Sequence, residues 1–131
     1  MSNAISPGTY LRLRREAACL SLLDVAVRLP TEPRWAEHDR VQLLTLIEAD
    51  VQPATFRTIV QLRQVFAFDF DVLVRLVLIA EGQPLPAPRL CLICACSEHD
   101  ACFAPGSPPC SWKAADICTA CEPRADRSAA A

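Results

Sequence analysis

Seven of the eight cysteines lie in the last third of the chain, at spacings typical of a metal site. These seven are Cys91, Cys94, Cys96, Cys102, Cys110, Cys118 and Cys121. The first two and the last two are C-x-x-C pairs, in which the backbone can wrap one tight turn around a soft metal ion. Two such pairs supply the four sulfur ligands of a tetrahedral site. The segment is therefore predicted to bind metal.

The number of thiols favours two ions. If the outer C-x-x-C pairs hold one ion, Cys96, Cys102 and Cys110 need one further donor to complete a second site. His99 is the natural candidate because imidazole commonly accompanies three thiolates, and Asp100 is the alternative. An interleaved arrangement, in which alternate ligands share an ion, also fits the spacing. Since every coordination position would be taken, we expect structural sites and not catalytic ones.

Zinc is the expected metal, and an iron–sulfur cluster is the alternative because soft thiolates bind both. The spacings of the familiar ferredoxins are absent. No secretory signal begins the sequence, so we expect a cytoplasmic protein whose clustered thiols stay reduced instead of forming disulfides. The cysteine segment has few large apolar side chains, and a structural zinc ion contributes about 10–16 kcal/mol to the folding of such small modules.

The composition narrows the class of protein further. The formal net charge of the 131 residues is −2, so no global basic field indicates a nucleic-acid partner. The most apolar run, 72–80, is short and contains Arg75, which argues against a membrane span. There is no glycine-rich phosphate loop and no recognisable nucleophile-and-base spacing, so we do not expect an enzyme.

Upstream of the cysteines, residues 9–82 show the apolar periodicity of an all-α domain with five helices. Ser21 and Asp24 form a capping-box pattern at the start of the second helix. The fourth helix is predicted to bury Phe56, and Gly82 is predicted to end the fifth helix as a C-cap. These helices form the main domain of the expected fold.

Three shorter segments follow this domain. Residues 83–89 have proline at every second position, which favours polyproline II and a semi-rigid linker. Residues 90–122 are the cysteine-rich module, for which we expect little regular secondary structure. Residues 123–131 lack apolar periodicity and are predicted to be a disordered tail. The expected fold class is all-α with a small metal-stabilised appendage.

Two sequence patterns of the helical domain occur in a familiar order. Residues 11–15 match L-R-x-x-R and lead to a second helix that begins at Ser21. Residues 47–48 read I-E and are followed by Pro53. In these patterns the domain resembles the lambda-repressor-like (XRE-type) helix-turn-helix family, whose recognition helix ends in I-E. The resemblance implies binding to duplex DNA through the major groove, usually as a two-fold homodimer.

The resemblance also implies which residues would contact DNA. The candidates are Arg12, Arg15, Arg34, Arg40, Gln42, Thr45 and Arg57. In such domains, side chains near the start of the recognition helix face base edges, and flanking arginines bind the backbone. Glu37 and Asp39 stand at this start and would face phosphates unfavourably. The alternative interpretation is a solvated surface on a fold that is reused for protein contact.

Two features depart from the family pattern. Cys19 occupies the turn between the first two helices, where the family has glycine and a left-handed backbone is expected. A side chain at this position costs free energy. About ten residues, 31–40, form a connection that is normally only a few residues long in this family.

The cysteine segment resembles a cysteine-rich module of bacterial and phage proteins that reads C-x-x-C-G-C, then C-x-W, then D-L-C-x-x-C. Trp112 follows Cys110 and Asp116 precedes Cys118 at the matching distances, whereas Ala95 stands where glycine is usual. The resemblance implies zinc binding without a defined role. Trp112 is expected to pack over the metal core, and the alternative is a stacking platform for a base or a partner's side chain.

Three functions are consistent with these patterns. The first is a small DNA-binding transcriptional regulator with a structural zinc module. The second is a protein–protein interaction adaptor on a helix-turn-helix scaffold. The third is a metal or redox sensor, in which the occupancy of the cluster controls DNA binding.

Overall fold

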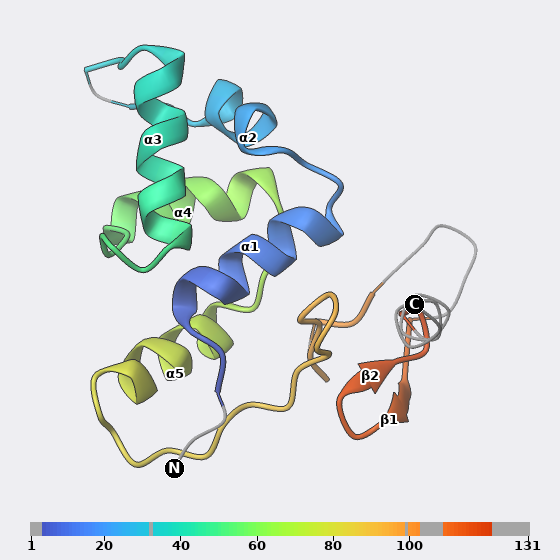
Figure 1. The fold of residues 1–131 in the computed structure, drawn as a ribbon. Helices are drawn as coiled ribbons and strands as arrows, with labels where there is room; N and C mark the ends of the chain where they lie inside the picture. The colour runs from blue at the N-terminus through green and yellow to red at the C-terminus, as the bar shows by residue number, and fades with distance from the viewer. Residues whose placement is uncertain (1–3, 32, 99, 103–108, 122–131) are drawn as a thin grey trace. The chain divides into compact units, whose positions relative to one another are not determined.

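The computed structural model describes residues 4–31, 33–98, 100–102 and 109–121. Its helices are α1 (Pro7–Ala17), α2 (Leu22–Arg28), α3 (Glu37–Glu48), α4 (Phe56–Val65) and α5 (Phe70–Ala80), and its strands are β1 (Trp112–Ala114) and β2 (Ile117–Cys118). The described residues are thus mainly helical, as the periodicity predicts (Figure 1). They divide into two compact units, Ile5–Phe68 and the residues from Asp69 onward with Ala4.

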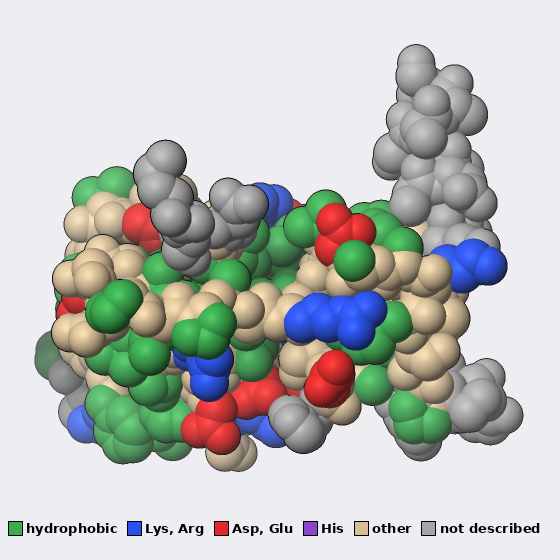
Figure 2. Space-filling model, turned by 90° about the horizontal axis from the view of Figure 1, so that it is seen from below, with side chains coloured by type: hydrophobic (Ala, Val, Ile, Leu, Met, Phe, Trp, Pro, Cys, Tyr) green, Lys and Arg blue, Asp and Glu red, His purple; other side chains and the backbone are tan. Residues whose placement is uncertain are grey.

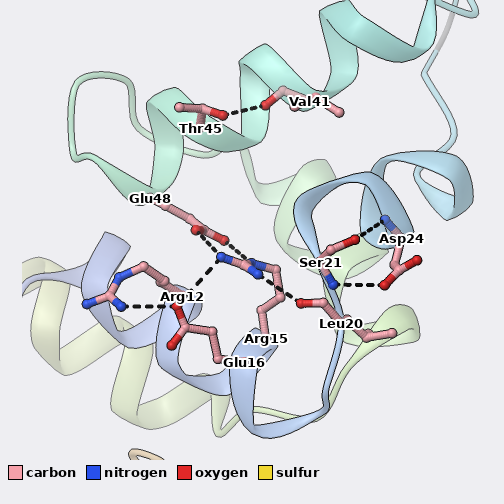
Figure 3. A network of polar contacts seen from close by, with 9 residues as sticks. All are labelled: Arg12, Arg15, Glu16, Leu20, Ser21, Asp24, Val41, Thr45 and Glu48. Carbon is pink, nitrogen blue, oxygen red and sulfur yellow. Dashed lines mark hydrogen bonds and ion pairs between the residues drawn. The ribbon is translucent and has the colours of Figure 1, made fainter.

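Local capping interactions start several of the helices. The Ser6 hydroxyl accepts a hydrogen bond from the Thr9 N–H at the start of α1, which satisfies one of the helix's unpaired donors. The predicted capping box of α2 is present. The Ser21 hydroxyl accepts from the Asp24 N–H at 3.0 Å, and the Asp24 carboxylate accepts from the Ser21 N–H at 2.9 Å (Figure 3).

In the unit Ile5–Phe68, α3 packs against α1 and α2, and α2 also contacts α4. The buried apolar side chains of this unit are Tyr10, Leu11, Val25, Ala26, Leu29, Leu44, Ile47, Leu62, Phe66 and Phe68. Phe56 is 71% exposed, so the prediction that it is buried is wrong. It is the first residue of α4, where the helix has only begun and its side chain faces solvent. Every helix of this unit except α4 contributes at least two residues to this apolar core.

Gly8 lets α1 approach the end of α3 closely. A Cβ atom at Gly8 would lie 2.5 Å from the Ile47 carbonyl oxygen and 2.6 Å from that of Glu48. The Gly8 N–H donates to the Asp50 carboxylate at 2.8 Å, and Asp50 itself has a φ of 60°. The contact therefore requires a residue without a side chain at position 8.

Cys19 has a φ of 60°, the left-handed conformation that the family resemblance implies for this turn. The Cys19 N–H donates to the Glu16 carbonyl, and the Leu20 N–H donates to that of Arg15, which closes the end of α1. Because cysteine has a Cβ atom, this turn carries strain that glycine would not.

The second unit begins with α5, whose N-cap Asp69 accepts from the N–H groups of Asp71 and Val72. Gly82 follows the helix with a φ of 97°, as its predicted role in ending the helix requires. Ser97 donates to the Asp69 carboxylate at 3.5 Å, which connects the start of the helix to the cysteine segment.

The expected linker, residues 83–89, lies inside this second unit, because the division of the chain falls at Phe68 and Asp69. The Arg75 guanidinium donates to the Pro86 carbonyl at 3.4 Å. The domain ranges predicted from the sequence stay a prediction. No helix in the described ranges is both long and apolar enough to cross a membrane.

The cysteine segment includes a small antiparallel hairpin. Strand β1 pairs with β2, with Trp112 opposite Cys118 and a register irregularity before Ala114. The Leu92 N–H donates to the Asp116 carbonyl at 2.8 Å, so the first cysteine turn is bonded to the tip of the hairpin. This arrangement places β2 and its cysteine beside the turn that carries the first C-x-x-C pair.

Candidate functional site

The centre of the cysteine segment consists of sulfur atoms. Five cysteines are buried, namely Cys91, Cys94, Cys96, Cys118 and Cys121, and Cys102 and Cys110 pack against them half-buried. None of the eight cysteines, all of which lie in the described ranges, forms a disulfide, and Cys19 is exposed on the helical unit. Because a cysteine side chain offers little apolar area, this centre gains little from burial alone.

The first group of sulfurs is the one predicted from the outer C-x-x-C pairs. The Sγ atoms of Cys91, Cys94, Cys118 and Cys121 all lie within 4.8 Å of one another, and all four residues are buried. A tetrahedral zinc site with Zn–S bonds of about 2.3 Å has sulfur–sulfur edges of about 3.8 Å. The four thiols therefore form a group that can hold one metal ion.

A second group differs from the predicted one. The Sγ atoms of Cys94, Cys96, Cys102 and Cys118 also lie within 4.8 Å of one another. The second group thus shares Cys94 and Cys118 with the first group. The prediction instead assigns Cys110 and His99 to the second site.

The other candidate ligands of the second site lie around this group. The Cys110 Sγ is 3.7 Å from that of Cys96 and accepts the Cys102 N–H at 3.1 Å. His99 lies outside the described residues. Asp100 is half-buried and exchanges two backbone hydrogen bonds of 3.2 Å with Ser97. The Cys110 sulfur therefore contacts the second group.

Tight backbone turns hold these thiols in place. The Ala95 N–H donates to the Cys91 carbonyl at 2.8 Å, and the Cys91 N–H donates to the Cys96 carbonyl at 3.0 Å. Ala95 has a φ of 61° and is fully buried, a backbone conformation that glycine adopts with less strain than alanine. At the other pair, the Cys121 N–H donates to the Cys118 carbonyl at 3.1 Å.

The crowding of the thiols separates their pKa values. A hydrogen bond from the Cys96 thiol, opposed by burial, lowers the pKa of Cys94 to about 4. The same hydrogen bond and burial raise the pKa of Cys96, and burial raises the pKa of Cys102 and of Cys121. Burial and the charge of Cys94 oppose ionisation of Cys118, but hydrogen bonds from the Cys121 backbone and thiol lower its pKa. Of these five thiols, Cys94 and Cys118 ionise most readily.

Arg89, which the sequence places in the linker, binds the hairpin of the cysteine segment. Its guanidinium donates to the carbonyls of Ala115 at 2.8 Å and Ala114 at 3.2 Å, and its Cζ atom lies 4.1 Å from the centroid of the Trp112 ring. Trp112 is half-buried and packs against the cysteine cluster. The predicted position of Trp112 against the cysteines is therefore confirmed, and the metal at their centre stays a prediction.

Two candidate DNA contacts are buried in the helical unit. Arg40 is 4% exposed, and its guanidinium donates to the carbonyls of Ala26 and Leu29 at the end of α2. Arg15 forms a two-pronged ion pair with Glu48, at 2.7 and 2.9 Å, and also donates to the Leu20 carbonyl (Figure 3). Both guanidinium groups are engaged inside the protein, so we omit Arg15 and Arg40 from the proposed DNA contacts.

The other candidates lie at the surface. Arg34, Gln42, Thr45 and Arg57 are exposed, and the Thr45 hydroxyl donates to the carbonyl of Val41 one turn earlier in α3. Arg12 is half-buried, and it pairs with Glu16 at 3.1 Å along α1.

A shallow groove of about 350 Å³ lies along one side of α3. It is lined by Trp35, Asp39, Gln42, Leu43, Leu46 and Gln52. The Trp35 side chain is 44% exposed, and its N–H donates to the Thr31 hydroxyl at 2.7 Å. The longer connection before α3 thus places an exposed aromatic side chain next to the surface of this helix.

Comparisons of the chain with protein-family models, with curated proteins and with solved structures find no match to any of them.

Proposed function

We propose that this protein is a small DNA-binding transcriptional regulator whose cysteine segment is folded around structural zinc. The observation that carries the metal part is the group of four buried thiols at Cys91, Cys94, Cys118 and Cys121, whose spacing suits a tetrahedral ion. Such a site uses all of its ligand positions for protein sulfur, so zinc would stabilise the fold and have no direct catalytic role.

The DNA-binding part rests on how the two helix-turn-helix patterns meet. Arg15 of L-R-x-x-R forms its buried ion pair with Glu48 of I-E, and α2 packs on α3. This contact supports the resemblance because the two patterns, which are far apart in the sequence, meet in one ion pair that joins α1 to α3. On this reading, α3 is the recognition helix, and its exposed Gln42 and Thr45 face base edges while Arg34 and Arg57 bind phosphates.

Salt-dependent binding to duplex DNA tests this proposal. We expect fluorescence anisotropy with duplexes from the neighbouring genomic DNA to show an affinity that falls steeply with salt. Arg57→Ala should reduce the slope of log affinity against log salt by about 1, because one phosphate contact is lost. Arg63→Ala, an exposed arginine of the same helix, is the matched control and should leave the slope unchanged. Absence of salt-dependent binding by the intact protein contradicts the proposal.

A protein-interaction adaptor is the second candidate, and the charges near α3 favour it. Glu37 and Asp39 are exposed in the first turn of α3, and Arg40 is turned inward. Figure 2, seen from below the view of Figure 1, shows both basic side chains and carboxylates among the described residues of that face. A protein that is folded but has no affinity for duplex DNA would favour the adaptor over the DNA-binding regulator.

The metal itself is tested by elemental analysis of protein purified from a reducing cytosol. We expect two zinc ions per chain and no absorbance near 400 nm, whereas an iron–sulfur cluster would give a brown protein. Iron–sulfur content would favour the sensor function, because redox change of the cluster then offers a means of controlling DNA binding. Light scattering with and without duplex tests the expected homodimer.

A further inference from the structure

We propose that the two metal ions form one binuclear cluster in which the sulfurs of Cys94 and Cys118 each bind both ions. The inference rests on the proposed metal binding and specifies how the ligands are divided. Cys91 and Cys121 would complete the first ion's coordination, and Cys96 and Cys102 would complete that of the second. Cys110 would lie outside the cluster.

The overlap of the two sulfur groups carries this proposal. Each group contains four thiols whose Sγ atoms all lie within 4.8 Å of one another, and both groups contain Cys94 and Cys118. The Sγ atoms of these two residues are 3.9 Å apart, close to the edge of about 3.8 Å expected for a tetrahedron of zinc-bound sulfurs. The pair is thus a common edge of two tetrahedra.

The contacts of the flanking thiols agree with this division. The Cys96 Sγ lies within 4.8 Å of those of both Cys94 and Cys118, and so does the Cys121 Sγ. Cys96 and Cys121 belong to different groups, so each shared sulfur contacts both sides of the cluster. The Cys94 Sγ also lies 3.4 Å from that of Cys102.

Ligand number and charge favour sharing as well. Two separate tetrahedral sites need eight donors, and the segment contains seven cysteines. Two bridging sulfurs reduce the requirement to six thiolates, and two Zn²⁺ ions with six thiolates carry a formal charge of about −2 in place of about −4 for two separate four-thiolate sites. A smaller charge is easier to bury.

Cadmium-113 NMR of the full-length protein tests the shared ligands directly, because Cd²⁺ takes the same soft thiolate ligands as zinc. We expect two ¹¹³Cd resonances, each split by coupling to the other through the bridging sulfurs. Two resonances without mutual coupling, or a single bound ion, would overturn the binuclear arrangement while metal binding stands. Failure to retain any Cd²⁺ or Zn²⁺ would overturn the proposed metal module itself.

A matched pair of variants and a thiol count provide a second readout. Cys110→Ser should keep two coupled ions, and Cys118→Ser, which leaves Cys94 as the single bridging sulfur, should change the coupling and release both ions more easily. Alkylation of the native zinc-loaded protein should modify Cys19 and Cys110 and spare the other six cysteines. Protection of Cys110, or loss of one ion in Cys110→Ser, would show that Cys110 is a ligand and would overturn the six-sulfur cluster.

Discussion

The helical unit and the cysteine segment keep their shapes by different means. In the residues Ile5–Phe68, side chains such as Tyr10 and Phe68 are almost fully buried among other apolar groups. Each such side chain contributes about 1.5–3 kcal/mol through burial. In the cysteine segment the buried residues are chiefly thiols. Their area is small, and as thiolates they repel one another.

This difference identifies which part of the protein responds to its surroundings. The apolar core of the helical unit is built from the side chains of the protein itself. Under the proposed function, the cysteine segment needs a cation to neutralise its sulfurs, because otherwise the conformational entropy of the chain is not offset. The proposal therefore predicts that the folding of the cysteine segment depends on its metal content and that the folding of the helical unit does not.

Metal removal should have the largest effect. A strong chelator with a reductant should unfold the cysteine segment, since structural zinc contributes about 10–16 kcal/mol to such modules. Amide NMR signals of residues 91–121 should collapse to random-coil positions, while the far-ultraviolet dichroism of α1 to α4 persists. A segment that keeps its dispersed signals after complete metal removal would break the comparison drawn above.

Removal of one partner of the buried ion pair should have the next largest effect. Glu48→Gln leaves the Arg15 guanidinium, whose side chain is 10% exposed, without its carboxylate. The free energy of unfolding of the helical unit should fall by about 3–5 kcal/mol. Urea denaturation measures this, with Glu16→Gln as the control. Glu16 pairs with Arg12 at 3.1 Å and lies 3.9 Å from Arg15, but its side chain is 48% exposed, so its loss should cost only about 0.5 kcal/mol or less.

Gly8→Ala should destabilise the helical unit through a steric clash. The added Cβ would lie against the Ile47 and Glu48 carbonyl oxygens, which are backbone atoms and cannot turn aside. We expect a loss of about 1–3 kcal/mol in urea denaturation. Gly82→Ala is the comparison, because its Cβ would contact nothing within 4 Å and only the left-handed φ would be strained. Its cost should be about 1 kcal/mol.

The same glycine substitution can be made in each unit. Cys19→Gly and Ala95→Gly both relieve a left-handed residue that carries a Cβ atom. We expect a gain of about 0.5–1 kcal/mol from each, after the greater entropy of glycine in the unfolded chain is included. The gain at Cys19 should raise the urea midpoint of the helical unit. The gain at Ala95 should appear as tighter zinc binding in competition with a chelator, and an unchanged affinity would contradict it.

The smallest effect concerns the capping box at low pH. Hydrogen bonds from the backbone and hydroxyl of Ser21 lower the pKa of Asp24 below its usual 3.8. A carboxylate with a lowered pKa stabilises the folded state above its unfolded pKa, and this stabilisation disappears as the pH falls through the folded value. The difference in urea midpoint between wild type and Asp24→Ala should therefore be present at pH 7 and shrink below about pH 4. A difference independent of pH would contradict this role for the carboxylate.

Much of the local structure follows from short stretches of sequence. The capping box at Ser21 and the group formed by the outer C-x-x-C pairs are present as their spacing predicts, and Cys19 has the left-handed backbone that the family resemblance implies. Each depends on residues that are close in sequence, or on chemistry that allows few arrangements, such as four sulfurs around one ion.

Long-range contacts account for what the sequence did not reveal. Arg15 and Arg40 look like surface arginines on a helix, but Glu48 and the carbonyls at the end of α2 draw them inside. The overlap of the two sulfur groups at Cys94 and Cys118 depends on how the hairpin carrying Cys118 folds back on the first cysteine turn. The spacing of residues along the chain limits which side chains can reach one another. Packing in three dimensions then decides which partner each polar group takes, because a buried charge or donor without a partner costs free energy.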